Sequence, residues 1–353
     1  MKATLYAMLF ALFALALAGC ASAAAPTLAP TSLPPTSAAP TSSSSAGPLV
    51  TVHLAYSAIA APQLPLWVAY EEGLFKQNGL DVPSLQYVSS NPSLTAALLS
   101  GQLQMAQLAE DGVISSGLQG GDLVILAPSA DHLLFSLYTK PDISQVQDLK
   151  GKKVGVTARG SATDFAARWL LTQHNLKPEQ DVTIINTGGV PDILTALESG
   201  AVDAGVLSPP TTFKAQQAGL KELVDFSTLN LPFYQSAVVA RKSWIKDNPD
   251  TVRKFVKAYV EAIALIKKNK ATAEKVLSKY SKTTDQTVLD GTYNAFVKVL
   301  PQAPIPSLDA IQTGLDEAAL TNPKAKTADP NQFFDASWVE ELNKSGFISS
   351  LYK

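Results

Sequence analysis

Short segments that alternate between apolar and polar residues predict strands, and each is followed by a segment with helical spacing. Residues 49–56 alternate like a strand, and residues 64–75 then carry apolar side chains three and four positions apart. The same order returns at residues 153–157, where helical spacing follows from Thr163 onward. Because a strand, a turn and a helix form half of a βαβ unit, the pattern predicts an α/β protein.

An internal repeat indicates that the α/β body consists of two similar lobes. Residues 96–108 align with residues 195–207, an offset of 195 − 96 = 99 positions. Each copy predicts a helix that ends at Ser-Gly, a short strand and a further helix. A period of this length that occurs twice indicates a duplicated lobe rather than a solenoid.

Two β-rich runs, residues 133–139 and 233–241, are predicted to cross between the lobes. We therefore expect lobe 2 at residues 135–232, inserted into lobe 1 at residues 49–134 and 233–353. Two rigid units joined by two extended connections are typical of a hinged protein that closes on a ligand.

The chain after the second crossing is predicted to be helical and to return to lobe 1. Asn248 is expected to cap a long helix whose apolar stripe runs from Val252 to Ile266. Further helices are predicted at 271–280, 284–296, 308–320 and 336–344.

The N-terminal residues are predicted to lie outside the folded body. Residues 1–20 read as a lipoprotein signal peptide, because an apolar run too short to cross a membrane ends in Leu-Ala-Gly-Cys. Cys20 is the one cysteine of the chain, so we expect it to carry a lipid rather than a disulfide. An ordinary signal peptide with an incidental cysteine is the alternative. Residues 21–48 carry no charge and are rich in Ala, Pro, Ser and Thr, which favours a disordered tether.

Composition and charge narrow the classes of function. The chain has 353 residues and 46% hydrophobic residues, enough for two medium α/β lobes with apolar cores. Lys and Arg (28) nearly balance Asp and Glu (30), so we expect no nucleic-acid partner. His53, His132 and His174 are scattered, and no HExxH, GxSxG or P-loop pattern occurs. The sequence therefore predicts no catalytic residue, no metal site and no cofactor.

The turn after residues 153–157 is the first candidate for a ligand contact. Gly160 and Ser161 precede a helix whose first N–H groups have no intrahelical acceptor, and such a helix start favours an anionic or polar ligand. The alternative is that Ser161 or Thr163 only caps the helix.

Five motifs together resemble a known family. They are LWVAYEEGLF at 66–75, GLDV at 79–82, LSG at 99–101, DLKGKKVGV at 148–156 and ALESGAVDA at 196–204. In this order they resemble the ABC-transporter substrate-binding proteins of the nitrate, sulfonate, taurine and thiamine-precursor type, over about residues 49–270. The resemblance implies a type II periplasmic-binding fold, with a cleft that closes around a small ligand.

The resemblance also implies that the loops after the strands of each lobe line the cleft. On this chain the candidate ligand-binding residues are Ser57, Ala58, Gln63, Asn91, Ser93, Glu110, Asp111, Arg159, Gly160, Ser161, Thr163, Gly189, Ser208 and Pro209. Arg159 is expected either to neutralise an anion or to be solvated at the surface. Asp111 is expected either to cap a helix at 112–118 or, with Glu110, to receive a ligand amine or ring N–H group.

The sequence thus predicts a lipid-anchored solute receptor outside the cytoplasm, on the periplasmic or outer face of a bacterial membrane. We expect a monomer, without enzymatic activity, that passes a sulfonate, nitrate, carboxylate or pyrimidine to an ABC permease. One alternative is a sensing module that docks to a receptor. Another is the family's thiamine-pyrimidine-forming enzyme, which needs a histidine at the cleft and a cysteine-rich loop; His132 is the one histidine near a crossing.

Overall fold

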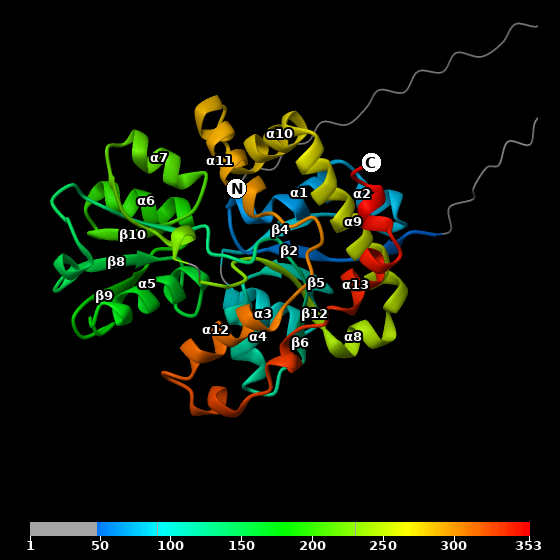
Figure 1. Cartoon of the computed structure of the whole chain (residues 1–353), viewed down its shortest axis with the longest axis horizontal. Helices are drawn as coiled ribbons and strands as arrows, with labels where there is room; N and C mark the ends of the chain where they lie inside the picture. Colours follow the sequence, from blue (N-terminus) through cyan, green and yellow to red (C-terminus); the bar gives the residue numbers. More distant parts are fainter. Residues whose placement is uncertain (1–47, 90, 230) are drawn as a thin grey trace, which may run out of the picture. The chain divides into compact units, whose positions relative to one another are not determined.

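The computed structural model describes residues 48–89, 91–229 and 231–353 (Figure 1). The predicted signal peptide, Cys20 and the tether, apart from Pro48, lie outside these residues. Within the described ranges, no helix is both long and apolar enough to cross a membrane.

Two five-stranded sheets organise the described residues. The first has the order β4-β2-β5-β12-β6, and its strands are β2 (Leu54–Tyr56), β4 (Leu85–Tyr87), β5 (Met105–Leu108), β6 (Leu123–Pro128) and β12 (Ala237–Arg241). The second has the order β9-β8-β10-β7-β11, and its strands are β7 (Ser136–Thr139), β8 (Lys153–Val156), β9 (Thr183–Asn186), β10 (Ala204–Leu207) and β11 (Lys221–Asp225). β1 (Val50–Thr51) pairs separately with β3 (Leu80–Asp81).

The two sheets share one topology. In each, the first three strands are parallel, and the fourth strand, β12 or β7, is antiparallel to both of its neighbours. β7 lies in the first predicted crossing and β12 in the second, so each crossing ends as the antiparallel strand of the sheet that it enters. This arrangement confirms the predicted fold class of two similar α/β lobes with a helical C-terminal region.

The helices that follow the strands cover the sheets (Figure 1). In lobe 1 they are the 3-10 helix η1 (Ala61–Gln63), α1 (Leu64–Glu71), α2 (Leu74–Gln77), α3 (Asn91–Leu99) and α4 (Glu110–Gly117). In lobe 2 they are α5 (Ala162–Gln173), α6 (Val190–Ser199) and α7 (Thr211–Gln217), with the 3-10 helices η2 (Val146–Leu149) and η3 (Phe226–Thr228). Val154 and Val206 of the second sheet are buried under α5, and Trp67 of α1 is fully buried in the core of lobe 1. Burial of such apolar side chains stabilises the packing of the helices on the sheets.

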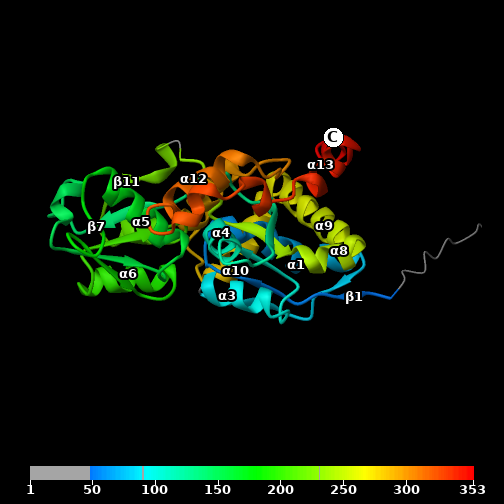
Figure 2. The ribbon, with the colours of Figure 1, turned by 90° about the horizontal axis from the view of Figure 1, so that it is seen from below.

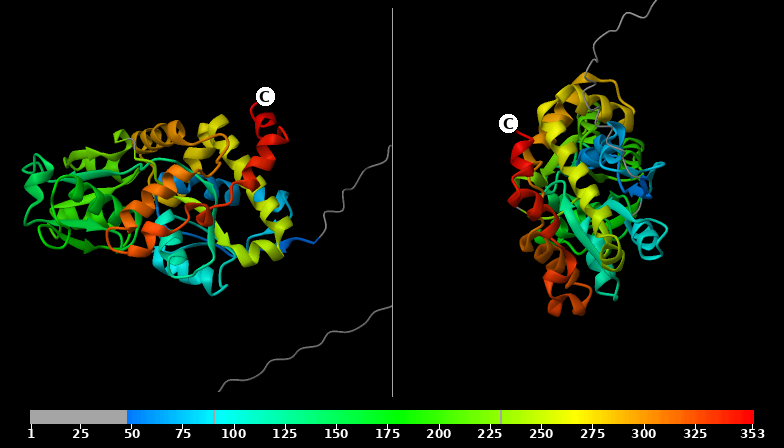
Figure 3. Two further views of the ribbon diagram at one scale, coloured as in Figure 1. Left: turned by 60° about the horizontal axis from the view of Figure 1, so that its bottom comes forward. Right: turned by 90° about the vertical axis from the view of Figure 1, so that its right-hand side faces the viewer.

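The C-terminal helices pack mainly on lobe 1. They are α8 (Lys242–Asp247), α9 (Pro249–Lys268), α10 (Lys270–Ser281), α11 (Gln286–Val299), α12 (Leu308–Ala318), α13 (Ser337–Lys344) and α14 (Phe347–Ser350), with η4 (Pro323–Thr327) and η5 (Pro330–Phe333). The predicted apolar stripe of α9 is buried against α1 and α2, where Phe255 stacks on Phe75 at 4.9 Å between ring centroids. α12 packs against α4, and Figures 2 and 3 show it reaching toward lobe 2.

Three local predictions need correction. The strand predicted at 49–56 breaks at Val52 and His53, since β1 pairs with β3 instead of with the large sheet. The helix predicted at 64–75 ends at Glu71 and restarts at Leu74, because Gly73 takes a left-handed conformation with φ of 69°. Asn248 makes no side-chain cap of α9; its Nδ2 donates instead to the Trp244 carbonyl at 2.9 Å.

Candidate functional site

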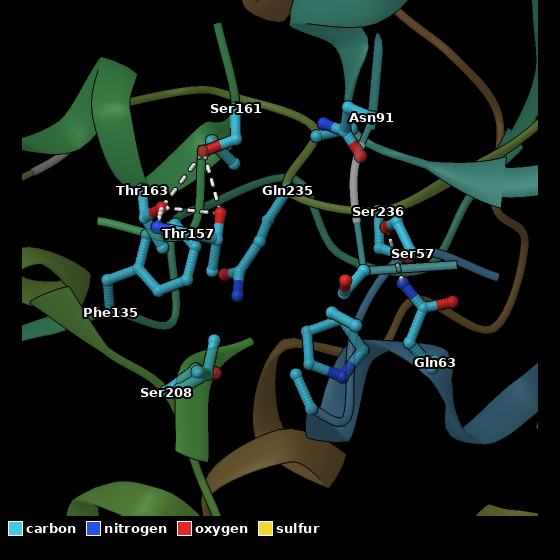
Figure 4. A pocket seen from close by; sticks show the side chains of 17 residues that line it. Ser57, Gln63, Asn91, Phe135, Thr157, Ser161, Thr163, Ser208, Gln235 and Ser236 are labelled. Carbon is cyan, nitrogen blue, oxygen red and sulfur yellow. Dashed lines mark hydrogen bonds between the residues drawn. The ribbon is translucent and has the colours of Figure 1, made fainter. Parts of the chain in front are cut away.

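The loops that follow three strands of each lobe meet in one cavity, which we call the hydroxyl pocket (Figure 4). The loops after β2, β4 and β5 contribute from lobe 1, and those after β8, β9 and β10 from lobe 2. The lining residues are Ser57, Ala58, Ala60, Pro62, Gln63, Ser89, Asn91, Ala109, Phe135, Thr157, Ser161, Ala162, Thr163, Val190, Ser208, Gln235 and Ser236. This is the edge at which open α/β sheets bind ligands.

The polar side chains of the hydroxyl pocket are hydroxyls and amides, without a charged residue among the lining residues. The empty volume of the pocket, including its open mouth, is about 440 Å³. The part of this volume in which the centre of a water molecule fits without touching protein atoms is about 40 Å³. Since one water needs roughly 10–15 Å³ of such space, the pocket fits a head group of a few atoms.

Helix starts give this uncharged pocket a positive potential. α3 begins at Asn91, α5 at Ala162 and α6 at Val190, and each of these residues lines the pocket. The first N–H groups of a helix lack intrahelical acceptors, and the helix dipole places partial positive charge there. The pocket therefore favours an anion or a strong hydrogen-bond acceptor.

Three hydroxyls at the start of α5 form a triangle. Thr157 Oγ1 lies 2.8 Å from Ser161 Oγ and 2.9 Å from Thr163 Oγ1, and the last two oxygens lie 2.9 Å apart. Ser161 Oγ donates to the Ala158 carbonyl at 2.7 Å, and Thr163 Oγ1 accepts from the Thr157 N–H group at 2.9 Å. The Ser161 and Thr157 hydrogens are used in the bonds to the Ala158 carbonyl and to Ser161 Oγ, so the Thr163 hydrogen either completes the triangle or turns toward a ligand.

Two buried polar atoms of the pocket have no hydrogen-bond partner within the described part of the chain. They are Ser208 Oγ, in a side chain that is fully buried, and Gln63 Oε1, in a side chain that is 1% exposed. An unsatisfied buried polar group costs about 1–3 kcal/mol, so a ligand that bonds to these atoms recovers that free energy. The Leu134 N–H group donates to Gln235 Oε1 at 2.6 Å and holds the Gln235 amide toward the centre of the pocket (Figure 4).

Seven of the residues predicted from the sequence meet in the hydroxyl pocket: Ser57, Ala58, Gln63, Asn91, Ser161, Thr163 and Ser208. Sequence reasoning missed other polar lining residues, which include Thr157, Gln235 and Ser236. Thr157 ends the predicted strand and gave a local signal, because a polar residue at the carboxyl end of a strand is a candidate contact. Gln235 and Ser236 lie in a crossing, and no motif marks them.

The other predicted residues lie around the hydroxyl pocket rather than in it. Arg159 and Gly160 are exposed and line two neighbouring cavities. The Pro209 carbonyl accepts from the Ala61 N–H group at 3.0 Å and thereby joins the lobes. A Cβ on Gly189 would stand 2.9 Å from the Tyr87 hydroxyl, a second close approach between the lobes. Ser93 is exposed and does not line the pocket.

The adjacent acids Glu110 and Asp111 sit behind the pocket. α4 begins at Glu110, two residues before the predicted start, and has no side-chain cap, so the prediction that Asp111 caps this helix is wrong. Asp111 instead accepts from Asn91 Nδ2 at 3.1 and 3.2 Å, and Glu110 Oε2 accepts from the Tyr234 N–H group at 2.9 Å. Burial raises the pKa of Asp111 to about 7 and the pKa of Glu110 well above its usual range. Protonation of these acids reduces their repulsion of an anion in the pocket.

The histidines lie away from the hydroxyl pocket. His132 Nδ1 lies 2.7 Å from Asp131 Oδ1 near the surface, and His174 contacts Gln147. Among the residues that the structure describes, no group of three or more His, Cys, Asp or Glu side chains is placed to hold a metal ion.

Three comparisons with known proteins bear on the family and the fold. The model of the family described as NMT1/THI5 like matches residues 62–273. A protein of Brachyspira hyodysenteriae, provisionally named an ABC transporter periplasmic binding protein, is 26% identical over 77% of this chain and 81% of its own. The solved alkanesulfonate-binding protein of Xanthomonas axonopodis pv. citri, bound to MOPS, is 17% identical with a TM-score of 0.67, over 80% of this chain and 96% of its own. The structural likeness confirms the predicted periplasmic-binding fold.

An enzyme is also among the relatives. The 4-amino-5-hydroxymethyl-2-methylpyrimidine phosphate synthase of Saccharomyces cerevisiae is 27% identical over 56% of this chain and 62% of its own.

Proposed function

The chain belongs to the NMT1/THI5-like family, and from that premise we propose that it is an extracytoplasmic substrate-binding protein of an ABC transporter. It captures a small ligand with an anionic or strongly accepting head group in the hydroxyl pocket and delivers it to the permease. The head-group classes are sulfonate, nitrate, carboxylate and an acceptor-rich pyrimidine.

One observation carries this proposal: corresponding loops of both lobes converge on a single uncharged pocket at three helix starts. A ligand held by both lobes stabilises the closed arrangement over the open one, since it contacts lobe 1 and lobe 2 together only when they meet. The permease then distinguishes the loaded closed form from the open form. The named relative and the alkanesulfonate-binding neighbour support this reading.

A ligand screen tests the proposal directly. The mature protein is heated with sulfonates, nitrate, carboxylates and pyrimidines in turn, and the melting temperature is recorded. A ligand at 100 times its Kd adds about 2.7 kcal/mol to the free energy of unfolding, so a binder raises the melting temperature clearly. Small-angle scattering of the binder complex should then show a more compact particle, and transport by cells that lack the protein should fail. A binder that leaves transport intact in such cells favours the sensing module.

Membrane attachment through a lipid on Cys20 belongs to the same proposal and rests on the Leu-Ala-Gly-Cys sequence followed by an uncharged tether. Cys20→Ala should move the protein from the membrane fraction to the soluble fraction and leave ligand affinity unchanged. A variant that stays in the membrane fraction would refute the lipid anchor.

The yeast synthase is the one relative named here that points to an enzyme. The donor set argues for binding instead, because the hydroxyl pocket is lined by hydroxyls and amides and by no histidine. Formation of a pyrimidine product by the purified protein supplied with iron would overturn the binding-protein proposal.

A further inference from the structure

A second cavity lies beside the first crossing, between lobe 2 and α11; we call it the crossing crevice. The lining residues that matter here are Ser136, Tyr138, Phe213, Glu222, Asp225 and Ala295. The centre of a water molecule fits in about 230 Å³ of the crevice, against about 40 Å³ in the hydroxyl pocket. The crevice therefore has room for a short organic molecule.

A β-bulge turns two carboxylates toward this crevice. In the pairing of β11 with β7, Glu222 lies opposite Tyr138, and Asp225 lies opposite Ser136. The register shifts between Glu222 and Val224, where β11 holds one residue more than β7. Without the extra residue, the two-residue period of a strand would send Glu222 and Asp225 to opposite faces of the sheet. The bulge therefore places both acids on the face that lines the crevice.

The register also sets the spacing of the two acids. Tyr138 and Ser136 are two residues apart on β7, and a strand rises about 3.4 Å per residue, so these positions are spaced about 7 Å along the sheet. Residues directly opposite each other have Cβ atoms about 4.5–5.5 Å apart, so each acid stands beside one hydroxyl. The crevice thus presents two carboxylate-hydroxyl pairs at a fixed separation.

The two acids have no counter-ion in the described part of the chain. Glu222 and Asp225 form no ion pair within residues 48–89, 91–229 and 231–353, and the lining residues include no lysine or arginine. Asp225 accepts from the Ser227 N–H group at 2.9 Å and from the Ser227 hydroxyl at 2.7 Å, both through Oδ1. The nearby Lys221 Nζ donates to the Ile143 carbonyl at 3.4 Å. The crevice therefore favours a cation.

An unsatisfied hydroxyl stands next to the acids. Tyr138 is fully buried, and its hydroxyl has no hydrogen-bond partner among the described residues. Burial, followed by the charge of Glu222, raises the pKa of Tyr138 to about 12, while the neighbouring Gln216 amide lowers it. Since Glu222 and Gln216 both line the crevice, the hydroxyl lies on that side of the ring. Its oxygen is free to accept a hydrogen bond from a cationic N–H group.

The wall opposite the sheet is apolar and belongs to α7 and α11. Phe213 of α7 and Ala295 of α11 line it. A Cβ on Gly291 would lie 2.5 Å from Phe213 Cε1, so the glycine lets the ring rest against α11, which packs on α7 (Figure 1). Such side chains pack against a hydrocarbon chain, and an aromatic ring also attracts a cation. A molecule in the crevice therefore contacts lobe 2 and α11 together.

We propose that the crossing crevice binds a short aliphatic diammonium ion, a molecule separate from the ligand of the hydroxyl pocket. One ammonium group lies at Glu222 and Tyr138. The other lies at Asp225 and Ser136, and about four carbons between the nitrogens suit the spacing of the acids. The ion stabilises the arrangement in which lobe 2 meets α11. Because α11 lies outside the region that matches the family, the site is a feature of this chain.

Three probes of one length test the site on the full mature protein. They are 1,4-diaminobutane, n-butylamine, which keeps one ammonium group, and 1,4-butanediol, which has hydroxyls in place of both. Titration calorimetry at neutral pH and low ionic strength should show that the diamine binds roughly tenfold or more tightly than the monoamine, because it engages both acids. The diol should not bind.

Three variants locate the ion. Glu222→Gln should weaken binding of the diamine roughly tenfold, to about the affinity of the monoamine. Glu198→Gln is the matched control, because Glu198 is an exposed glutamate of α6 in the same lobe and lies outside the crevice; it should leave the affinity unchanged. Tyr138→Phe should weaken binding of the diamine and leave the melting temperature of the free protein unchanged or higher, since it removes an unsatisfied buried hydroxyl.

Each outcome decides the proposal. No measurable binding of the diamine, or equal affinities for the diamine and the monoamine, would overturn the diammonium site. Binding that survives both Glu222→Gln and Tyr138→Phe would overturn its assignment to the crevice. A lower melting temperature of Tyr138→Phe without amine would show that the hydroxyl already has a structural role and would overturn its assignment as a contact. The ligand screen of the hydroxyl pocket is independent of all these results, so the proposed function fails or stands separately.

Discussion

In each lobe, the loop after the third strand lies at the same position of the same sheet topology, yet one loop carries acids and the other carries a neutral hydroxyl. After β5, lobe 1 continues with Ala109, Glu110 and Asp111, and after β10, lobe 2 continues with Ser208 and Pro209. Ala109 and Ser208 both line the hydroxyl pocket. The loop of lobe 1 thus leads to Glu110, which is fully buried, and to Asp111. The loop of lobe 2 presents the buried Ser208 hydroxyl, which has no hydrogen-bond partner among the described residues.

The first loops differ in a related way. After β8, the oxygens of Thr157, Ser161 and Thr163 lie within 2.8–2.9 Å of one another. After β2, the one such contact joins Gln63 Nε2 to Ser57 Oγ at 3.4 Å. The comparison teaches that a duplicated topology fixes where the loops meet, whereas the residues on the loops decide what each lobe does. Lobe 2 presents a preorganised cluster of hydroxyls at the pocket, whereas the first loop of lobe 1 does not.

The largest expected effect removes the preorganised donors of lobe 2. The double variant Ser161→Ala with Thr163→Ala should weaken ligand binding roughly 10- to 100-fold. The Thr163 hydroxyl can donate one hydrogen bond to a charged group, which contributes about 1.5–3 kcal/mol, and the Ser161 hydroxyl holds the loop through its bond to the Ala158 carbonyl. The corresponding lobe 1 variant, Ser57→Ala, should weaken binding only a few-fold. Calorimetric titration measures both, and equal losses for the two lobes would contradict the assigned division of labour.

The second residue of the third strand differs between the lobes, and we expect a larger side chain there to destabilise lobe 2. Gly205 of β10 stands where β5 has Ala106, and a Cβ on Gly205 would lie 2.4 Å from Ile193 Cγ2. Gly205→Ala should therefore destabilise the protein by about 1–3 kcal/mol through overpacking. Thermal denaturation checks this value. Gly205→Ala combined with Ile193→Ala, which removes the clashing Cγ2, should lose less stability than the sum of the two single variants. An unchanged melting temperature for the single variant would show that α6 shifts freely.

The single variant Ser161→Ala separates the two roles of this hydroxyl. Ser161 is the N-cap of α5 and accepts from the Asp164 N–H group at 3.4 Å, and it also lines the hydroxyl pocket. We expect an affinity loss of about 1–2 kcal/mol, roughly tenfold in Kd, and a stability loss of ~1 kcal/mol. If the melting temperature falls and Kd stays constant, the serine is only a helix cap.

The last expected effect is a pH dependence from the raised pKa of an acid in lobe 1. Burial raises the pKa of Asp111 from 3.8 to about 7, so the folded state holds this proton more tightly than the unfolded state. The stabilisation that results is complete at pH values below 3.8, the pKa of this carboxyl group in the unfolded state, and it is lost as the pH rises toward 7. The melting temperature should fall over this interval, and it should fall less in Asp111→Asn. Glu317, whose pKa is also raised to about 7, contributes in the same direction. An identical slope in the variant would contradict this assignment.

The sequence by itself determined the features that depend on local periodicity and on the repeat. Alternation at residues 153–157 and helical spacing after Thr163 predicted β8 and α5, and the 99-residue offset predicted two lobes of one plan. Ser161 was a recognisable helix start, because a serine before an apolar helical stripe is a local signal.

Only the tertiary structure decided which residues face one another across the lobes. Gln235 lines the same pocket as Ser161 because the chain passes from one sheet to the other before β7 and again before β12. No spacing in the sequence indicates that these two residues lie close together. Glu317 and Ser161 line one cavity because α12 packs on α4 beside α5, although Glu317 follows Ser161 by 317 − 161 = 156 residues. Local pattern sets the elements through short-range backbone preferences, whereas the site depends on long-range packing, in which burial of whole faces determines which loops converge.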